Sequence, residues 1–176
     1  CITMVYCWRN ICIMFCIFKG KKQMRLSKNF TLTEFEKSQT AIRQGLDNTM
    51  PEEHMENAKA LCENVLQKVR DHYGPVIINS GYRGEALNKA VGGSAKSQHC
   101  KGQAADIEIH GVSNYDLAKW IEKKTDFDQV ILEFYTPGIP DSGWVHVTYN
   151  TAGNRKKSLT ASRVDGRTHY SLGLNK

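Results

Sequence analysis

The sequence contains no apolar run long enough to cross a membrane as a helix. Its longest such stretch, residues 11–18, has eight residues, whereas a membrane span needs about 20. Basic residues follow this stretch instead of a small-residue cleavage site, so it is also a poor signal peptide. We therefore expect synthesis in the cytoplasm, no clear secretion signal and no stable insertion in a membrane.

Cysteine is scarce after residue 28. Of the six cysteines, only Cys62 and Cys100 lie there, and the sequence has no CxxC pair. Two cysteines do not form the disulfide framework of a small secreted domain, and a thiolate zinc site usually has closely spaced pairs. The sequence therefore excludes a disulfide framework and a thiolate zinc site, and it favours folding in a reducing compartment.

Acidic residues are absent from residues 1–28, which hold six of the 24 basic residues. The other 18 basic residues face 18 acidic ones, so the rest of the chain is neutral although the whole has a net charge of +6. A nucleic-acid-binding domain needs basic residues clustered on its folded part, and only Arg155, Lys156 and Lys157 form such a cluster. We therefore expect no nucleic-acid partner.

The sequence becomes more ordinary after Met24. We interpret residues 1–27 as an N-terminal extension that is disordered or not part of the native protein, with residues 1–23 as upstream translated sequence or a disordered extension. Residues 28–176 are then one domain with a C-terminal hairpin, long enough to bury a core without disulfides. The chain has no internal repeat, and we expect a monomer.

Apolar residues at helical spacing predict helices mainly in the first half of the chain. Thr33 and Glu36 have the spacing of a capping box for a first helix that ends near Gly45. The same spacing recurs at Ser113 and Asp116. The expected helices begin near Thr33, Pro51, Glu85 and Ser113.

Short apolar segments with alternating polarity predict strands in the second half. Strands are expected at residues 76–78, 105–109, 129–134 and 144–149. The pair Asp165-Gly166 predicts a hairpin turn between two further strands. Because the connections between strands are short, we predict an α+β fold with a mostly antiparallel sheet and not a doubly wound fold.

Three polar residues are predicted to meet on one face of this sheet. Gly102 permits a turn that brings His99 back beside the strand of Asp106. If the apolar residues of two strands face the core, Asp106 and His146 share the opposite face, where paired positions are about 5 Å apart. Zinc bonds of roughly 2.0–2.2 Å to nitrogen and oxygen bridge that gap, and three protein ligands leave a fourth position for water.

Two further residues suit catalysis next to such an ion. Glu133 lies in the strand segment 130–134, whose other residues are apolar, and it is the best candidate for the general base. Arg83 follows the first strand, where a guanidinium stabilises an oxyanion or binds a substrate carboxylate. The alternatives are that Glu133 is an ordinary edge-strand charge, that Glu108 is the acid, and that Cys100 is a fourth ligand.

The remaining histidines have an ordinary structural interpretation. They lie on predicted helices, at a strand end or near the hairpin, and they are His54, His72, His110 and His169.

Three motifs resemble the D-alanyl-D-alanine carboxypeptidase family of zinc peptidases. Residues 97–106, SQHCKGQAAD, are similar to the family signature SxHxxGxAxD. WVHV at 144–147 resembles the strand of the third ligand, and SGYR at 80–83 resembles the segment with the family's arginine. The similarity covers about residues 28–161 and is greatest to compact members found in phages and prophages.

The resemblance implies the Hedgehog/DD-peptidase fold, a small antiparallel sheet flanked by helices. It implies one zinc ion on His99, Asp106 and His146. It also implies that Arg83 steadies the tetrahedral intermediate and that Ser97 lies near the substrate.

The resemblance is less direct about the catalytic acid. Several family members place it three residues before the third ligand, and here that residue is Gly143, which has no side chain. The Hedgehog-like arrangement instead has a glutamate at the end of the preceding strand, which corresponds to Glu133. Asp141 is the reserve candidate.

The expected activity is hydrolysis of an amide bond in peptidoglycan stem peptides during phage-type cell-wall lysis, after release from the cell or in a virion. Carboxypeptidase and endopeptidase action both fit the sequence. The alternative is a zinc-stabilised module that binds cell wall, or builds a virion, without cutting. Glu133 and Arg83 together favour the enzyme, because a structural zinc site needs neither.

Overall fold

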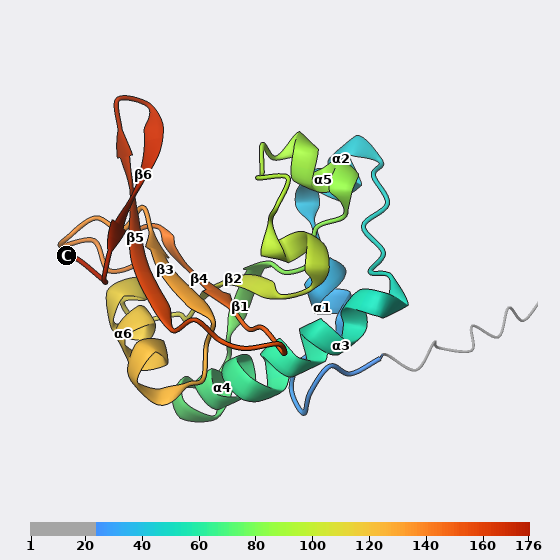
Figure 1. Cartoon of the computed structure of the whole chain (residues 1–176), viewed down its shortest axis with the longest axis horizontal. Coiled ribbons are helices and arrows are strands. Elements are labelled where there is room, and N and C mark those ends of the chain that lie inside the picture. The colour runs from blue at the N-terminus through green and yellow to red at the C-terminus, as the bar shows by residue number, and fades with distance from the viewer. Residues whose placement is uncertain (1–23) are drawn as a thin grey trace, which may run out of the picture.

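The computed structural model describes residues 24–176, and the predictions for residues 1–23 lie outside this range (Figure 1). Leu26 is buried in the main core, so the packed part of the chain begins before residue 28, our expected boundary. No helix in the described part is both long and apolar enough to cross a bilayer. The helices are α1 (Leu32–Glu36), α2 (Gln39–Gln44), α3 (Glu52–Leu61), a π-helical turn (Cys62–Leu66), α4 (Gln67–Tyr73), α5 (Glu85–Ala90), a 3-10 turn (Gln98–Lys101) and α6 (Asn114–Lys124).

Two short helices stand where a single helix from Thr33 was predicted. Thr31 and Glu34 form the capping box that starts α1. This box lies two residues earlier in the sequence than predicted. Ser38 then caps α2 by accepting a hydrogen bond from a backbone N–H, which interrupts the helical run. Gly45 ends α2 in the left-handed conformation with φ 62°, as predicted. One helix was predicted instead of two because apolar spacing alone does not show where a second N-cap interrupts a helix.

Helices α3 and α4 form one continuous helix through the π-helical turn, and they cover the helix predicted from Pro51. Pro51 is the N-cap of α3 and not its first residue, and Gly74 ends α4. The predicted apolar stripe is confirmed, because its central residues are fully buried: Ala58, Leu61, Cys62, Val65, Leu66 and Val69. Helix α6 begins after Ser113 as expected, but the Ser113 side chain makes no capping hydrogen bond.

Six strands form one sheet in the order β1-β2-β4-β3-β5-β6. The strands are β1 (Ile77–Ser80), β2 (Ala104–Glu108), β3 (Gln129–Glu133), β4 (Trp144–Thr148), β5 (Lys157–Val164) and β6 (Arg167–Leu172). All pairs are antiparallel except β3 with β5, so the predicted α+β fold with a mostly antiparallel sheet is confirmed. The parallel pair follows from the strand order. Both edges of β4 are taken by β2 and β3, so β5 pairs with the free edge of β3. The chain reverses direction from β3 to β4 and again from β4 to β5, and β5 therefore runs parallel to β3.

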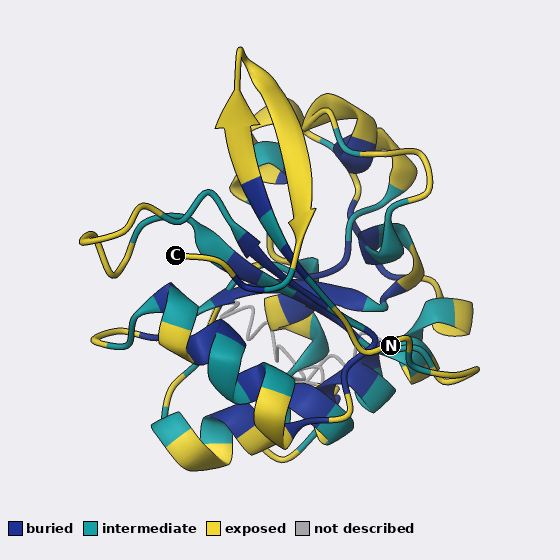
Figure 2. Cartoon of the chain, turned by 60° about the vertical axis from the view of Figure 1, so that its left-hand side comes forward, coloured by how far each residue is buried: buried dark blue, intermediate teal, exposed yellow. Residues whose placement is uncertain are grey.

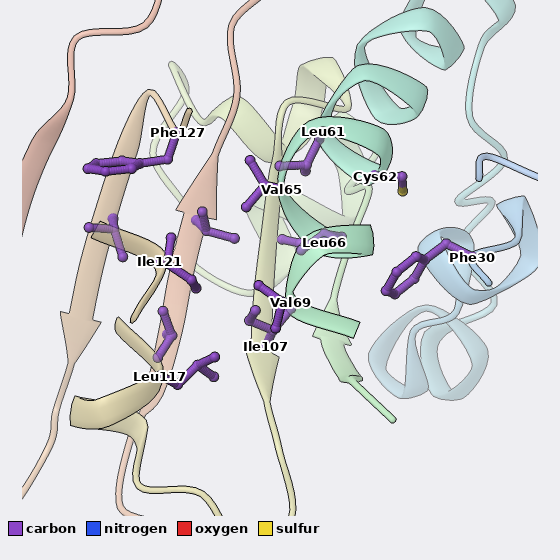
Figure 3. Packing of buried hydrophobic residues seen from close by; sticks show 14 of the residues in the cluster. Phe30, Leu61, Cys62, Val65, Leu66, Val69, Ile107, Leu117, Ile121 and Phe127 are labelled. Carbon is purple, nitrogen blue, oxygen red and sulfur yellow. The ribbon is translucent and has the colours of Figure 1, made fainter. Parts of the chain in front are cut away.

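The two faces of the sheet have different surroundings. Figure 3 shows Ile107 of β2 beside Val69 of the long helix, with Leu66 and Val65 further along the helix, and all four belong to the main core cluster. Helix α6 packs on β3 and β4 on the same side. Since neighbouring residues of a strand point to opposite faces, the helices cover the face of Ile107 and leave the face of Asp106 for the site.

The C-terminal hairpin of β5 and β6 extends from the sheet (Figure 1) and is mostly exposed (Figure 2). Asp165 and Gly166 both have positive φ, 49° and 75°, as a two-residue type I′ turn requires. The predicted hairpin turn is therefore confirmed. Leu174 follows β6 and is buried in the main core, so the hairpin returns to the body of the domain.

Candidate metal centre

The centre is built where the 3-10 turn meets strands β2 and β4. Asp106 and His146 are direct partners across these two antiparallel strands, so their side chains share one face. The 3-10 turn ends at Gly102 with φ 68°, and this left-handed residue returns the chain so that His99 lies beside β2. Ser97 begins the turn, and its hydroxyl accepts a hydrogen bond from the His99 N–H at 3.3 Å.

Three ligand atoms converge on a common point. His146 Nδ1 is 2.8 Å from Asp106 Oδ1 and 3.2 Å from His99 Nε2. His99 Nε2 is 3.3 Å from Asp106 Oδ1. A tetrahedral zinc ion with bonds of about 2.0–2.1 Å separates its ligand atoms by about 3.3 Å. Two sides of the triangle match this spacing and the 2.8 Å side is shorter, so the three residues form a candidate metal site.

The other ring nitrogen of His99 is already used. His99 Nδ1 lies 2.7 Å from the carbonyl oxygen of Gly81. A carbonyl can only accept, so Nδ1 donates and Nε2 keeps its lone pair for the centre of the triangle. This backbone contact fixes both the ring orientation and the tautomer, as is usual for histidines that bind metals.

The electrostatics favour the protonation states that bind a cation. Burial raises the pKa of Asp106, but the adjacent His99 and His146 outweigh it and hold this pKa well below its usual range. Burial lowers the pKa of His99, which favours the neutral imidazole. A carboxylate and a neutral imidazole are the forms in which these side chains coordinate a metal.

Arg83 lies in the centre, as predicted, and contacts one of the candidate ligands. Its Nη2 donates to Asp106 Oδ2 at 3.2 Å, leaving Oδ1 to face the histidines. Its Nε is buried and has no hydrogen-bond partner within the described part of the chain. Arg83 and Asp106 also border a cavity of about 300 Å³, whose polar wall comes from α2 and β1: Ser38, Gln39, Thr40, Asn79 and Ser80. The guanidinium therefore has donors to spare next to a space that can hold a ligand.

Glu133 lies on the same face of the sheet at the end of β3. Ile131 is the direct partner of His146, and Glu133 is two residues further along the strand. Burial raises the pKa of Glu133, and the charge of Asp106 raises it further, whereas His146 and Arg83 lower it. A partly buried carboxyl with a raised pKa beside a candidate metal site is suited to proton transfer near neutral pH.

The alternative residues lie elsewhere. Cys100 and Glu108 are not in the converging group of ligand atoms, which within the described residues consists of His99, Asp106 and His146. Asp141 is exposed in the loop between β3 and β4. His72 stacks on Trp120 with ring centroids 4.7 Å apart, a structural contact as predicted. The other histidines are likewise outside the triangle: His54, His110 and His169.

Sequence reasoning missed an anchor behind the site. The fully buried carboxylate of Asp128 accepts hydrogen bonds from Arg155 Nη2 at 2.6 Å and from Gln98 Nε2 at 3.0 Å. Gln98 directly precedes His99, so Asp128 ties this turn to the start of β3. The partners are 27 and 30 residues from Asp128, and no local pattern in the sequence links them.

The same contacts account for most of the basic cluster at residues 155–157. Arg155 pairs with Asp128, and Lys156 pairs with Asp126 at 2.5 Å. These two charges are therefore paired within the domain and do not form a free basic surface.

An α+β sheet that presents two imidazoles and a carboxylate to one point is an arrangement that metal-dependent hydrolases use. Comparison with protein families makes the assignment more specific. The model of the family described as Peptidase M15 matches residues 28–148, which is more than half of the chain, and the chain belongs to this family of zinc peptidases. A search of curated proteins found no match. The resemblance to D-alanyl-D-alanine carboxypeptidase-like zinc peptidases is thereby confirmed at the level of the family.

Proposed function

We propose that this protein is a zinc metallopeptidase that hydrolyses an amide bond in peptidoglycan stem peptides. The observation that supports it best is the triangle of His99 Nε2, Asp106 Oδ1 and His146 Nδ1, with sides of 2.8–3.3 Å. These side chains suit zinc because their nitrogen and oxygen donors fit its preferred ligands and leave one position open. Membership of the Peptidase M15 family supports the same activity.

The bound ion would lower the pKa of a water molecule to about 7 and polarise the scissile carbonyl. Glu133 takes the proton from the attacking water and returns it to the leaving amine. Its position on the sheet face of His146 and its raised pKa both support this role. Ser97 fixes the backbone of His99, and we propose that it also contacts the substrate.

Arg83 stabilises the negative charge that develops on the carbonyl oxygen. One of its N–H groups is engaged with Asp106, and its buried Nε–H has no protein partner in the described residues. A buried guanidinium with a free donor is a strong anion-binding group. The adjacent cavity of about 300 Å³, which Arg83 borders, gives the substrate access to the guanidinium group.

We further propose that the protein acts as a monomer in phage-type lysis, made in the cytoplasm and reaching the cell wall after release or in a virion. The motifs at residues 80–83, 97–106 and 144–147 support this role through their similarity to compact phage members of the family.

The decisive experiment measures free amino groups released from purified peptidoglycan. We expect release with zinc, none with a chelator, and recovery when zinc is added back. Glu133→Gln should abolish most of the release, and Glu108→Gln, which changes a glutamate outside the ligand group, should not. Binding to the cell wall with no release of amino groups would instead favour the non-catalytic module.

A further inference from the structure

The C-terminal hairpin extends the face of the sheet that carries the candidate metal centre. Residues paired directly across neighbouring strands point to the same face. One such row crosses five strands and consists of Asp106, His146, Ile131, Leu159 and Leu172. The side chain of Leu172 in β6 therefore lies on the face of the metal centre. The whole hairpin lies outside residues 28–148, the part that matches the family.

A second row passes through the proposed general base. It consists of Trp144, Glu133, Ala161 and Tyr170. Only the methyl group of Ala161 stands between Glu133 and Tyr170 along this row. Burial raises the pKa of Tyr170, and the charge of Glu133 raises it further, as expected for two groups that are close together.

The domain leaves most of the surface of the two large apolar side chains of β6 exposed. Tyr170 is 59% exposed and Leu172 is 77% exposed. The alternate residues on the opposite face, Arg167, His169 and Ser171, are polar and also exposed. Placing the large apolar residues on one side only does not stabilise an edge strand that is exposed on both faces. Their position beyond the buried floor of Ile131, Leu159 and Ala161 indicates contact with a ligand on the metal side.

We propose that Tyr170 and Leu172 bind the arm of the peptide substrate that extends from the scissile bond past Glu133, and so make the enzyme selective for extended peptides. This inference rests on the proposed function. The occupant is a peptide because the two residues continue the sheet rows that contain His146 and Glu133. The cavity beside Arg83 lies toward β1, at the other side of the centre, and serves the other arm.

The geometry sets the length of this arm. Three steps between strands separate His146 from Leu172, which is about 14 Å at ~4.8 Å per step. An extended peptide advances about 3.3–3.6 Å per residue, so about four residues cover this distance. A terminal dipeptide cannot reach Leu172, whereas a stem peptide can.

The experiment measures kcat/KM for a series of synthetic stem peptides that differ only in the length of one arm, from one to five residues. The wild type should gain activity with length until the arm covers the hairpin. Tyr170→Ala combined with Leu172→Ala should lower kcat/KM for the longest peptide roughly tenfold and leave the shortest cleavable peptide unchanged. The matched control is His169→Ala, an exposed neighbour on the opposite face of β6.

The outcomes separate this inference from the proposed function. An equal loss on all peptide lengths, or no loss on the longest, overturns the role of Tyr170 and Leu172 and leaves the proposed function intact. A wild type that cleaves no peptide overturns the proposed function and this inference with it. Activity on the shortest peptide is the internal measure that the double variant is folded.

Discussion

Asp106 and His146 are direct partners across strands β2 and β4, and their Oδ1 and Nδ1 atoms are 2.8 Å apart. This pairing fixes two of the three candidate ligands by backbone hydrogen bonds of a central sheet and not by a mobile loop. Only His99 must be brought in from elsewhere, and the turn at Gly102 does so. A rigid pair with one positioned partner is a preorganised site for a small cation.

The first prediction concerns metal binding. His146→Ala removes one of three ligands, so the purified variant should lose stoichiometric zinc, whereas the wild type keeps about one ion per chain. Metal analysis after gel filtration measures this directly. His169→Ala removes an exposed histidine and should keep the ion. Full zinc content in the His146 variant would show that the ion is held elsewhere.

The pairing of Asp106 with His146 was predictable because strand periodicity is strict. Apolar neighbours of both residues face the helices, so a single alternation rule assigns both side chains to the opposite face. The turn at Gly102, which brings His99 back beside the strand of Asp106, was likewise predictable from the sequence. The position of Glu133 among apolar residues of a strand made it the best candidate for the general base, and the resemblance to the family agreed, with Asp141 in reserve. The structure shows Asp141 exposed in a loop.

Other features depend on contacts that no local pattern encodes. The Asp128–Arg155 ion pair joins residues 27 apart, and the backbone contact between His99 and Gly81 joins residues 18 apart. The parallel pairing of β3 with β5 depends on which sheet edge is free, a property of the whole topology.

The second prediction separates chemistry from metal binding. Glu133→Gln keeps the shape of the side chain but removes its ability to accept a proton. Zinc content should stay at the wild-type level, and kcat should fall by roughly 10²- to 10⁴-fold. Steady-state kinetics with a synthetic stem peptide, together with metal analysis of the same sample, provide the measurement. Unchanged kcat would assign the general base to another residue.

The third prediction follows from the raised pKa of Glu133. A general base acts only when ionised, so activity is present above its pKa and is lost as the pH falls through it. Because burial raises this pKa, the acidic limb of the kcat/KM profile should lie above pH ~4.3, the ordinary value for glutamate. Burial also means that ionised Glu133 destabilises the metal-free fold at neutral pH, so Glu133→Gln freed of metal should unfold at a higher temperature than the metal-free wild type at pH 7. An acidic limb at or below the ordinary value would contradict the assignment.

The fourth prediction tests the anchor behind the site. Arg155→Ala leaves the buried carboxylate of Asp128 without its cation, and we expect the free energy of unfolding to fall by about 3 kcal/mol. This is the lower end for a broken buried pair, because the Arg155 side chain is 55% exposed although that of Asp128 is 1% exposed. Urea denaturation at pH 7 gives the value.

The pH dependence of this pair gives a second measure. Burial raises the pKa of Asp128, but the hydrogen bonds and charge of Arg155 outweigh it and depress the pKa below the ordinary range. The stabilisation is therefore complete above the unfolded pKa of about 3.9 and is lost as the pH falls toward the folded value. The difference between wild type and Arg155→Ala should shrink on acidification, and a constant difference down to pH 2 would argue against the ion pair.

The last prediction uses two glycines with nearly the same φ. Gly102 and Gly92 have φ of 68° and 70°, left-handed values at which alanine is strained. At Gly102 a Cβ would also lie 2.7 Å from the backbone oxygen of His54, whereas at Gly92 it would meet nothing within 4 Å. Gly102→Ala must therefore shift the turn that carries His99, and its zinc affinity should fall by at least tenfold, because displacing one ligand by a fraction of an ångström weakens coordination. Gly92→Ala should lose only about 1 kcal/mol of stability and keep its zinc affinity. Competition with a chromogenic chelator measures both affinities, and equal affinities in the two variants would mean that the close approach to His54 does not position His99.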